Sequence, residues 1–384
     1  MMKLTRNAAA VLAAAAVAAC GGGSGEQQPA PPCTPPGTGF DPAHPPQHLS
    51  DLSLLVPSPG AVTPKAGVIP YDLNTPLFSD YAQKTRLVYV PPGSSAAYDA
   101  VASLDLPVGT IVAKTFALAP DQRSPATGRK LVETRLLVHT ADGWKGYPYV
   151  WNDAETEATY TPGGRKTQMP MVTPSGTSVT ADYLVPSQSQ CSQCHEDHNP
   201  GDAGSLPMHL LGPTARNLNR DYDYATGTQN QLDAWTAAGI LTGAPPSADA
   251  PKLVAAHDPA SGTVEERARA WLEVNCAFCH STTGLAYTSG LHLGTAVTDP
   301  YELGICKPPV AAGPGTGGRL HDIVPGSPDD SILVYRVEAR WDDPDLPNFD
   351  QAVMPPLGRT VRSEEGVALV RQWISDMTPT PCAP

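Results

Sequence analysis

Leu131-Val-Glu-Thr-Arg-Leu-Leu-Val138 and Trp144-Lys-Gly-Tyr-Pro-Tyr-Val-Trp151 flank the turn sequence Ala141-Asp-Gly143. Both runs are rich in β-branched and aromatic residues, and an Asp-Gly turn between two such runs predicts a β-hairpin. Tyr147 and Tyr149 occupy alternate positions of the second run, so they share one face of the strand. We expect this aromatic face to lie in a core rather than to bind a ligand.

The sequence around this hairpin has the same character. Thr85-Arg-Leu-Val-Tyr-Val90 and Thr110-Ile-Val-Ala-Lys-Thr-Phe116 are partly alternating runs bounded by Pro and Gly. Runs of this kind predict further strands. Residues 49–185 are therefore predicted to form an all-β, sandwich-like domain.

Helix signals replace strand signals after residue 186. Thr228-Gln-Asn-Gln231 and Thr263-Val-Glu-Glu266 match the capping-box pattern, and Ser363 precedes two glutamates. Apolar residues at helical spacing follow each of these starts. We expect two mostly α domains, over residues 186–258 and 259–384, so the predicted fold class is multidomain.

Two segments of the chain share the pattern Cys-x-x-Cys-His. They are Cys191-Ser-Gln-Cys194-His195 and Cys276-Ala-Phe-Cys279-His280. The pattern is the attachment signature of haem c, because two thiols at this spacing reach the two vinyl groups of one porphyrin and the histidine is held beneath the iron. A thioredoxin-like pair would need a βαβ context, and a zinc ribbon would not need a histidine after each pair. The segments predict two covalently bound haem c groups, with His195 and His280 as iron ligands.

A six-coordinate haem iron needs a sixth ligand, which is commonly Met or His. For the second haem we expect Met354, which lies in a Pro-rich loop before the last predicted helix. For the first haem we favour Met208, and an iron without a strong sixth ligand stays open as an alternative. The residues that compete with Met208 are His198, His209, His257, Met169 and Met171.

The amino-terminus has the pattern of a secretory signal. A basic start precedes the apolar run Ala8 to Ala19, and Val17-Ala-Ala-Cys20 resembles the bacterial lipobox. We expect a signal peptide over residues 1–19, a lipid on Cys20 and a flexible Pro/Gly tether over residues 20–48. The protein is then an exported lipoprotein, facing the periplasm or anchored in the outer membrane, and the leaflet stays open.

Composition narrows the possible partners. Hydrophobic residues make up 41% and charged residues 16% of the 384-residue chain, which fits a folded protein. A net charge of −13 excludes binding to a nucleic-acid backbone. No apolar run after the amino-terminus reaches the roughly 20 residues of a membrane span.

Three cysteines remain after the two motifs and the lipid site are assigned: Cys33, Cys306 and Cys382. At most one disulfide can join three thiols within one chain. All three pairings are possible, and we expect Cys33 with Cys382.

Several further stretches carry a family resemblance: Ile69–Asp80, Leu131–Asp153, Leu211–Asn219, the second haem region, Asp322–Pro328 and Met354–Arg359. With them, the chain resembles a family of bacterial dihaem c-type cytochromes, which are often lipoproteins with a β-rich amino-terminal domain. The resemblance implies that the two mostly α domains are cytochrome c-like haem domains, with His195 and His280 as proximal haem ligands, and it supplies no substrate. The last hundred residues of the chain are also similar to cytochrome domains appended to dehydrogenases.

These observations favour an electron carrier over a catalyst. In the leading hypothesis a dihaem cytochrome passes electrons between periplasmic or cell-surface redox proteins, whose identities stay open. A dihaem peroxidase that uses an open first iron is a second hypothesis. In a third, residues 49–185 dock a partner, such as an exported dehydrogenase, and the haems relay electrons.

Overall fold

The computed structural model describes residues 40–198, 206–311, 313–340 and 352–382. Signal peptide, lipid site Cys20 and Cys33 lie outside these ranges. The described residues from 40 onward belong to one compact unit. Among them, no helix is long and apolar enough to cross a bilayer.

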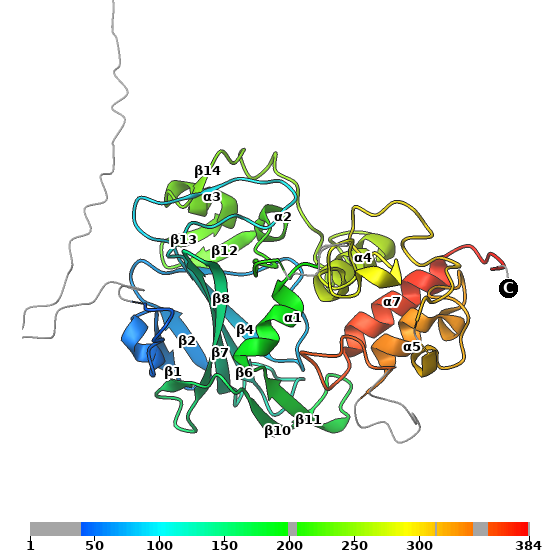
Figure 1. Ribbon diagram of the computed structural model, residues 1–384, viewed down its shortest axis with the longest axis horizontal. Helices are drawn as coiled ribbons and strands as arrows, with labels where there is room; N and C mark the ends of the chain where they lie inside the picture. Colours follow the sequence, from blue (N-terminus) through cyan, green and yellow to red (C-terminus); the bar gives the residue numbers. More distant parts are fainter. Residues whose placement is uncertain (1–39, 199–205, 312, 341–351, 383–384) are drawn as a thin grey trace, which may run out of the picture. The chain divides into compact units, whose positions relative to one another are not determined.

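The centre of the fold is a six-stranded antiparallel sheet with the strand order β3-β4-β6-β7-β8-β9 (Figure 1). Its strands are β3 (Ile69–Tyr71), β4 (Gln83–Tyr89), β6 (Ile111–Leu118), β7 (Lys130–Thr140), β8 (Gly143–Trp151) and β9 (Ala158–Tyr160). The predicted hairpin is confirmed as β7 and β8, which pair from Glu133 opposite Val150 to Thr140 opposite Gly143. The aromatic face of β8 is confirmed as core, since Tyr147 and Tyr149 are fully buried.

Smaller sheets surround the central one. They consist of β1 (Leu55–Ser58) with β2 (Ala61–Pro64), β10 (Arg165–Val172) with β11 (Ser178–Val185), β12 (Asp221–Tyr224) with β13 (Gly227–Asn230), and β5 (Ala96–Ala97) with β14 (Leu241–Thr242). Only the last pair is parallel.

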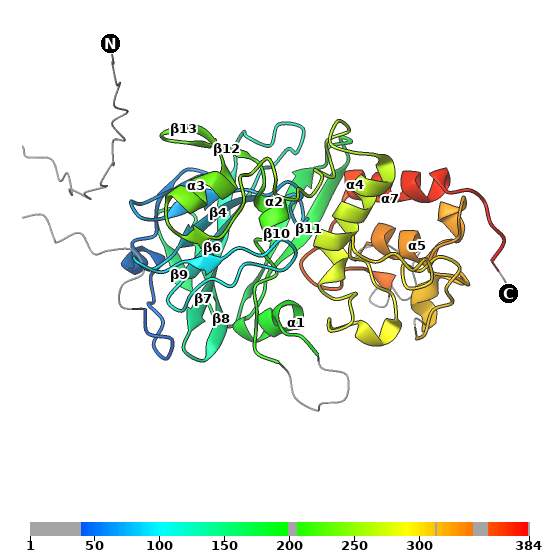
Figure 2. The ribbon, with the colours of Figure 1, turned by 90° about the horizontal axis from the view of Figure 1, so that it is seen from above.

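The α-helices of the described residues are α1 (Ser192–His195), α2 (Ala215–Leu218), α3 (Gln231–Ala237), α4 (Val264–Leu272), α5 (Ile332–Glu338) and α7 (Glu364–Asp376). Figure 2 shows α4, α5 and α7 side by side, and α7 packs against both of the others. Short 3-10 turns occupy Leu49–Leu52, Gln188–Cys191, Tyr287–Ser289, Gly313–Thr316 and Pro328–Asp330, and a π-turn occupies Glu273–Ala277.

Two of the three predicted helix starts are confirmed. Thr263 caps α4 in a full capping box with Glu266, and the Ser363 hydroxyl accepts from the amide of Gly366 at the start of α7. The third start lies elsewhere, because Thr228 is part of β13 and the side chain of Asn230 caps α3.

The predicted fold class is wrong. The described part of the structure is mostly β, with helix over only about 21% of its residues, and it does not contain two mostly α haem domains. Residues 221–242 contribute three strands beside one short helix. The reason is that this region completes the core of the sheet instead of building its own: Trp235 and Leu232 are buried against Tyr71 and Trp144.

The disulfide expectation is also wrong. Cys306 is bonded to Cys382, so the bridge joins the end of the chain after α7 to a loop within the carboxy-terminal part. Cys191, Cys194, Cys276 and Cys279 are free thiols.

Candidate functional site

The second Cys-x-x-Cys-His segment lies at the end of a helix. Helix α4 continues through the π-turn Glu273–Ala277, which carries Cys276. A cavity of about 270 Å³ opens beside it, with Cys276, Cys279 and His280 on its wall. Met354 lines the same cavity, so residues 74 positions apart in sequence meet there.

The wall of this cavity is largely apolar. An ion pair between Lys307 Nζ and Asp322 Oδ2, at 3.2 Å, and the Arg336 side chain supply its charged groups. Burial raises the pKa of Asp322. The apolar side chains that line it include Leu291, Leu293, Ile332, Leu333, Val337 and Pro355.

Burial determines the protonation states of Cys276, Cys279 and His280 in the second segment. It lowers the pKa of His280 to about 4, with Arg336 adding to the effect, so the imidazole is neutral at pH 7. His280 Nδ1 lies 3.4 Å from the Ser289 hydroxyl. Burial raises the pKa values of Cys276 and Cys279 to about 12, so both are thiols rather than thiolates.

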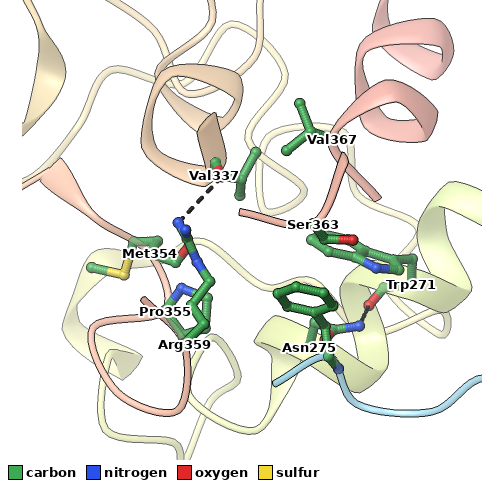
Figure 3. Close-up of a pocket in the computed structure, with 9 residues that line it drawn as sticks. Trp271, Asn275, Val337, Met354, Pro355, Arg359, Ser363 and Val367 are labelled. Atoms are coloured by element: carbon green, nitrogen blue, oxygen red, sulfur yellow. Dashed lines mark hydrogen bonds between the residues drawn. The ribbon is translucent and has the colours of Figure 1, made fainter. Parts of the chain in front are cut away.

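Arg359 holds the loop that carries Met354. Its Nε donates to the Met354 carbonyl over 2.9 Å, and Nη1 donates to the carbonyl of Ala339 over 3.0 Å. Figure 3 shows the bond from Arg359 to the Val337 carbonyl, 3.2 Å long, and the thioether of Met354 directed away from Arg359. One buried guanidinium therefore ties the methionine loop to the end of α5.

A segment of the β-rich part braces both sides of the cavity. The Phe78 amide donates to Asn275 Oδ1 over 2.7 Å, directly before Cys276. Asp80 Oδ1 accepts from the amides of Thr360 and Val361, at 2.6 and 2.7 Å, just after the methionine loop. Neither Asp80 nor Asn275 stood out in the sequence, because each contact joins residues about 200 or more positions apart.

In the first segment, Cys191 is the last residue of the 3-10 turn Gln188–Cys191, and Ser192–His195 form α1. His195 Nδ1 lies 2.8 Å from the carbonyl oxygen of His209, which makes Nδ1 the donor and leaves the lone pair on Nε2. Burial lowers the pKa of His195 to about 4, so it too is neutral. Burial also raises the pKa values of Cys191 and Cys194.

The structure does not single out which residue would be a second ligand opposite His195. Met208 is half-buried and packs against the core that contains Trp144 and Leu210. Met171 is buried among Phe116 and Tyr183. The pairing of Met208 with His195 stays a prediction.

The loops that directly follow the two segments contact each other. The His198 amide donates to the Thr283 carbonyl over 2.6 Å. The Thr283 hydroxyl donates to Asp197 Oδ1 over 2.9 Å. The Cys194 thiol also contributes to raising the pKa of Cys279. Both segments are visible in the sequence, whereas the contact between the loops that follow them joins residues 86 positions apart.

Comparison with known proteins corrects two expectations. No family model, curated protein or solved structure matches the chain. Within the described part of the chain, no three or more His, Cys, Asp or Glu side chains gather where they could hold a metal ion. With the β-rich fold, these findings overturn the resemblance to dihaem c-type cytochromes and the prediction of two covalently bound haem c groups.

Proposed function

We propose that the protein transfers electrons between redox partners in the cell envelope, with the two Cys-x-x-Cys-His segments as its redox centres. The contact between the loops that follow the two segments carries this proposal: 2.6 Å from the His198 amide to the Thr283 carbonyl, and 2.9 Å from the Thr283 hydroxyl to Asp197. The Cys194 thiol is also near enough to Cys279 to contribute to its raised pKa, so the two centres are close enough for electrons to pass between them within one molecule.

The second segment is not suited to thiol–disulfide exchange with partner proteins at neutral pH. Thiol–disulfide exchange proceeds through a thiolate. With pKa values of about 12, Cys276 and Cys279 supply almost none at pH 7.

Lipidation at Cys20 would hold this carrier at a membrane surface, where exported redox proteins are its partners. The net charge of −13 favours partners with a basic docking surface. Electrostatic steering of this kind weakens as the salt concentration rises.

Redox titration of the exported protein tests the proposal. Purified wild type is titrated with dithionite and then ferricyanide, while intact mass reports any group attached to the chain. We expect two reversible transitions in addition to the two electrons consumed by the Cys306–Cys382 bond. The double variant Cys276→Ser, Cys279→Ser is expected to lose one transition.

Ser192→Ala is the matched control, because this exposed hydroxyl lies between the two cysteines of the first segment. It should keep both transitions. A wild-type protein that takes up no electrons beyond those of the disulfide would refute the proposed function.

A further inference from the structure

A band of cations crosses one face of the central sheet. Arg86 of β4 lies opposite Lys114 of β6, and Lys114 lies opposite Arg135 of β7. Lys84 lies two residues from Arg86 on the same face, opposite Phe116. The side chains of Lys84, Lys114 and Arg135 surround the Phe116 ring, at 5.6, 5.3 and 4.4 Å from its centre.

The carboxylates near this cation band do not balance its charge. Asp72 pairs with Arg86 at 2.8 Å and is shared with Arg220. Glu133 pairs with Arg135 at 2.5 Å and also accepts from the Tyr183 hydroxyl.

Among the described residues, neither lysine of the band forms an ion pair with a carboxylate, although Asp80 is near enough to Lys84 to favour its charged form. Lys84 donates to the carbonyl of Ala82 over 2.9 Å. No hydrogen bond or ion pair reaches the Lys114 ammonium from any residue that the structure describes, and the ammonium lies over the Phe116 ring.

Like charges at directly opposite positions of a sheet are destabilising. Burial, together with Arg135 and Arg86, lowers the pKa of Lys114 to about 7. The central strands therefore bear a cost that a bound anion would remove.

The first Cys-x-x-Cys-His segment lies on this same face of the sheet. A Cβ atom at Gly146 of β8 would lie only 2.6 Å from Cys191 Sγ, so the segment packs against β8 where a glycine makes room. Gly146 lies opposite Leu137, and the next row on that face joins Pro148, Arg135, Lys114 and Arg86. The cation band is thus the row adjacent to the cysteine.

We propose that the cation band, with Lys114 at its centre, binds a small anion beside the first Cys-x-x-Cys-His segment. The ligand class is a carboxylate or an inorganic oxyanion, since ammonium and guanidinium groups recognise the oxygens of both. This site is independent of the electron transfer proposed above.

Thermal unfolding of the exported full chain tests this site. Sodium phosphate and sodium succinate are each compared with sodium chloride at the same ionic strength. At saturating concentration, at least one of them is expected to raise the unfolding midpoint of the wild type by about 2–4 °C. Stabilisation by phosphate alone identifies an inorganic oxyanion, and stabilisation by succinate alone identifies an organic carboxylate.

Variants of Lys114 test whether the rise in the unfolding midpoint comes from the cation band. Lys114→Met should remove most of the shift, whereas Lys114→Arg should keep it because the charge remains. Lys166→Met, at an exposed position of β10, is the control and should behave as the wild type. The proposal is overturned if neither anion shifts the wild type, or if Lys114→Met keeps the full shift.

Discussion

His195 and His280 show how burial decides the chemical state of a side chain. Both imidazoles would be partly charged in water near their ordinary pKa, but burial lowers the pKa of each to about 4. Both are therefore neutral over the physiological range. A neutral imidazole with Nδ1 committed to a protein oxygen presents Nε2 as a free acceptor, and His195 has this arrangement with the carbonyl of His209.

Lys114 is the residue whose titration should be visible in stability. Its pKa is about 7 in the folded chain and about 10.4 when unfolded. Between these values the unfolded chain binds the proton and the folded chain does not, so stability rises with pH across that window. Below pH 7 both states are protonated and the penalty is constant. The charged and titratable groups that act on Lys114 are Lys84, Arg86, Glu133, Arg135, Cys194 and His195.

We therefore expect Lys114→Met to exceed the wild type in free energy of unfolding at pH 6, without added anion. The difference should shrink as the pH rises toward 9.5, because the folded wild type then holds Lys114 neutral. Urea unfolding at a series of pH values measures it, with Lys166→Met as control. A difference that stays constant with pH would contradict the lowered pKa.

At the scale of elements, short sequence patterns correctly predict the strands and helices whose formation depends on residues close by in the sequence. The β7–β8 hairpin follows from its Asp-Gly turn, and α4 and α7 begin at their predicted caps. Thr228 fails as a cap because pairing of β12 with β13 draws it into a strand. In that case a hydrogen-bonded ladder outweighed a capping preference.

The segment around Asp80 is the element whose role no local signal reveals. We expect Asp80→Ala to lower the free energy of unfolding by about 2–4 kcal/mol, because two buried amides lose a charged acceptor. Amide hydrogen exchange at Thr360 and Val361 should accelerate as the methionine loop loosens. Urea unfolding and exchange mass spectrometry measure the two effects.

Asp182→Ala is the matched control for this prediction, since Asp182 is exposed on β11. It should change stability by no more than about 0.5 kcal/mol. Unchanged exchange at Thr360 in the Asp80→Ala variant would show that the brace does not hold the loop.

At the scale of the whole molecule, side chains from distant parts of the sequence share one core. Trp144 of the sheet packs with Leu210 and Trp235, and β5 pairs with β14 across about 145 residues. Contacts between residues this far apart in the sequence hold residues 206–250 in place on the sheet. This explains why the region does not form the separate helical domain that its capping pattern predicted.

The disulfide also stabilises the molecule at this scale. Cys306 and Cys382 close a loop of 76 residues around α5 and α7. Replacing both by serine should lower the free energy of unfolding by about 2–4 kcal/mol. Wild type should lose a similar amount when dithiothreitol is added, and the double variant should not respond. Peptide mapping that finds Cys382 free in the exported protein would contradict the bridge.

The sequence by itself determined the hairpin, the caps of α4 and α7, the aromatic core face and the two Cys-x-x-Cys-His segments. Each of these depends on residues within a few positions of one another, through turn chemistry, alternation or capping. The predictions of the cofactor and the family, made from the same kind of local pattern, were wrong. The spacing of two cysteines and a histidine contains no information about the fold that surrounds them.

Only the tertiary structure decided which segments meet. It brought Met354 to the cavity of His280, set Thr283 against His198, and laid the cation band beside Cys191. These contacts form because burying apolar surface from distant segments outweighs the cost of closing long loops. That balance is a property of the whole chain, so no short stretch of it carries the information.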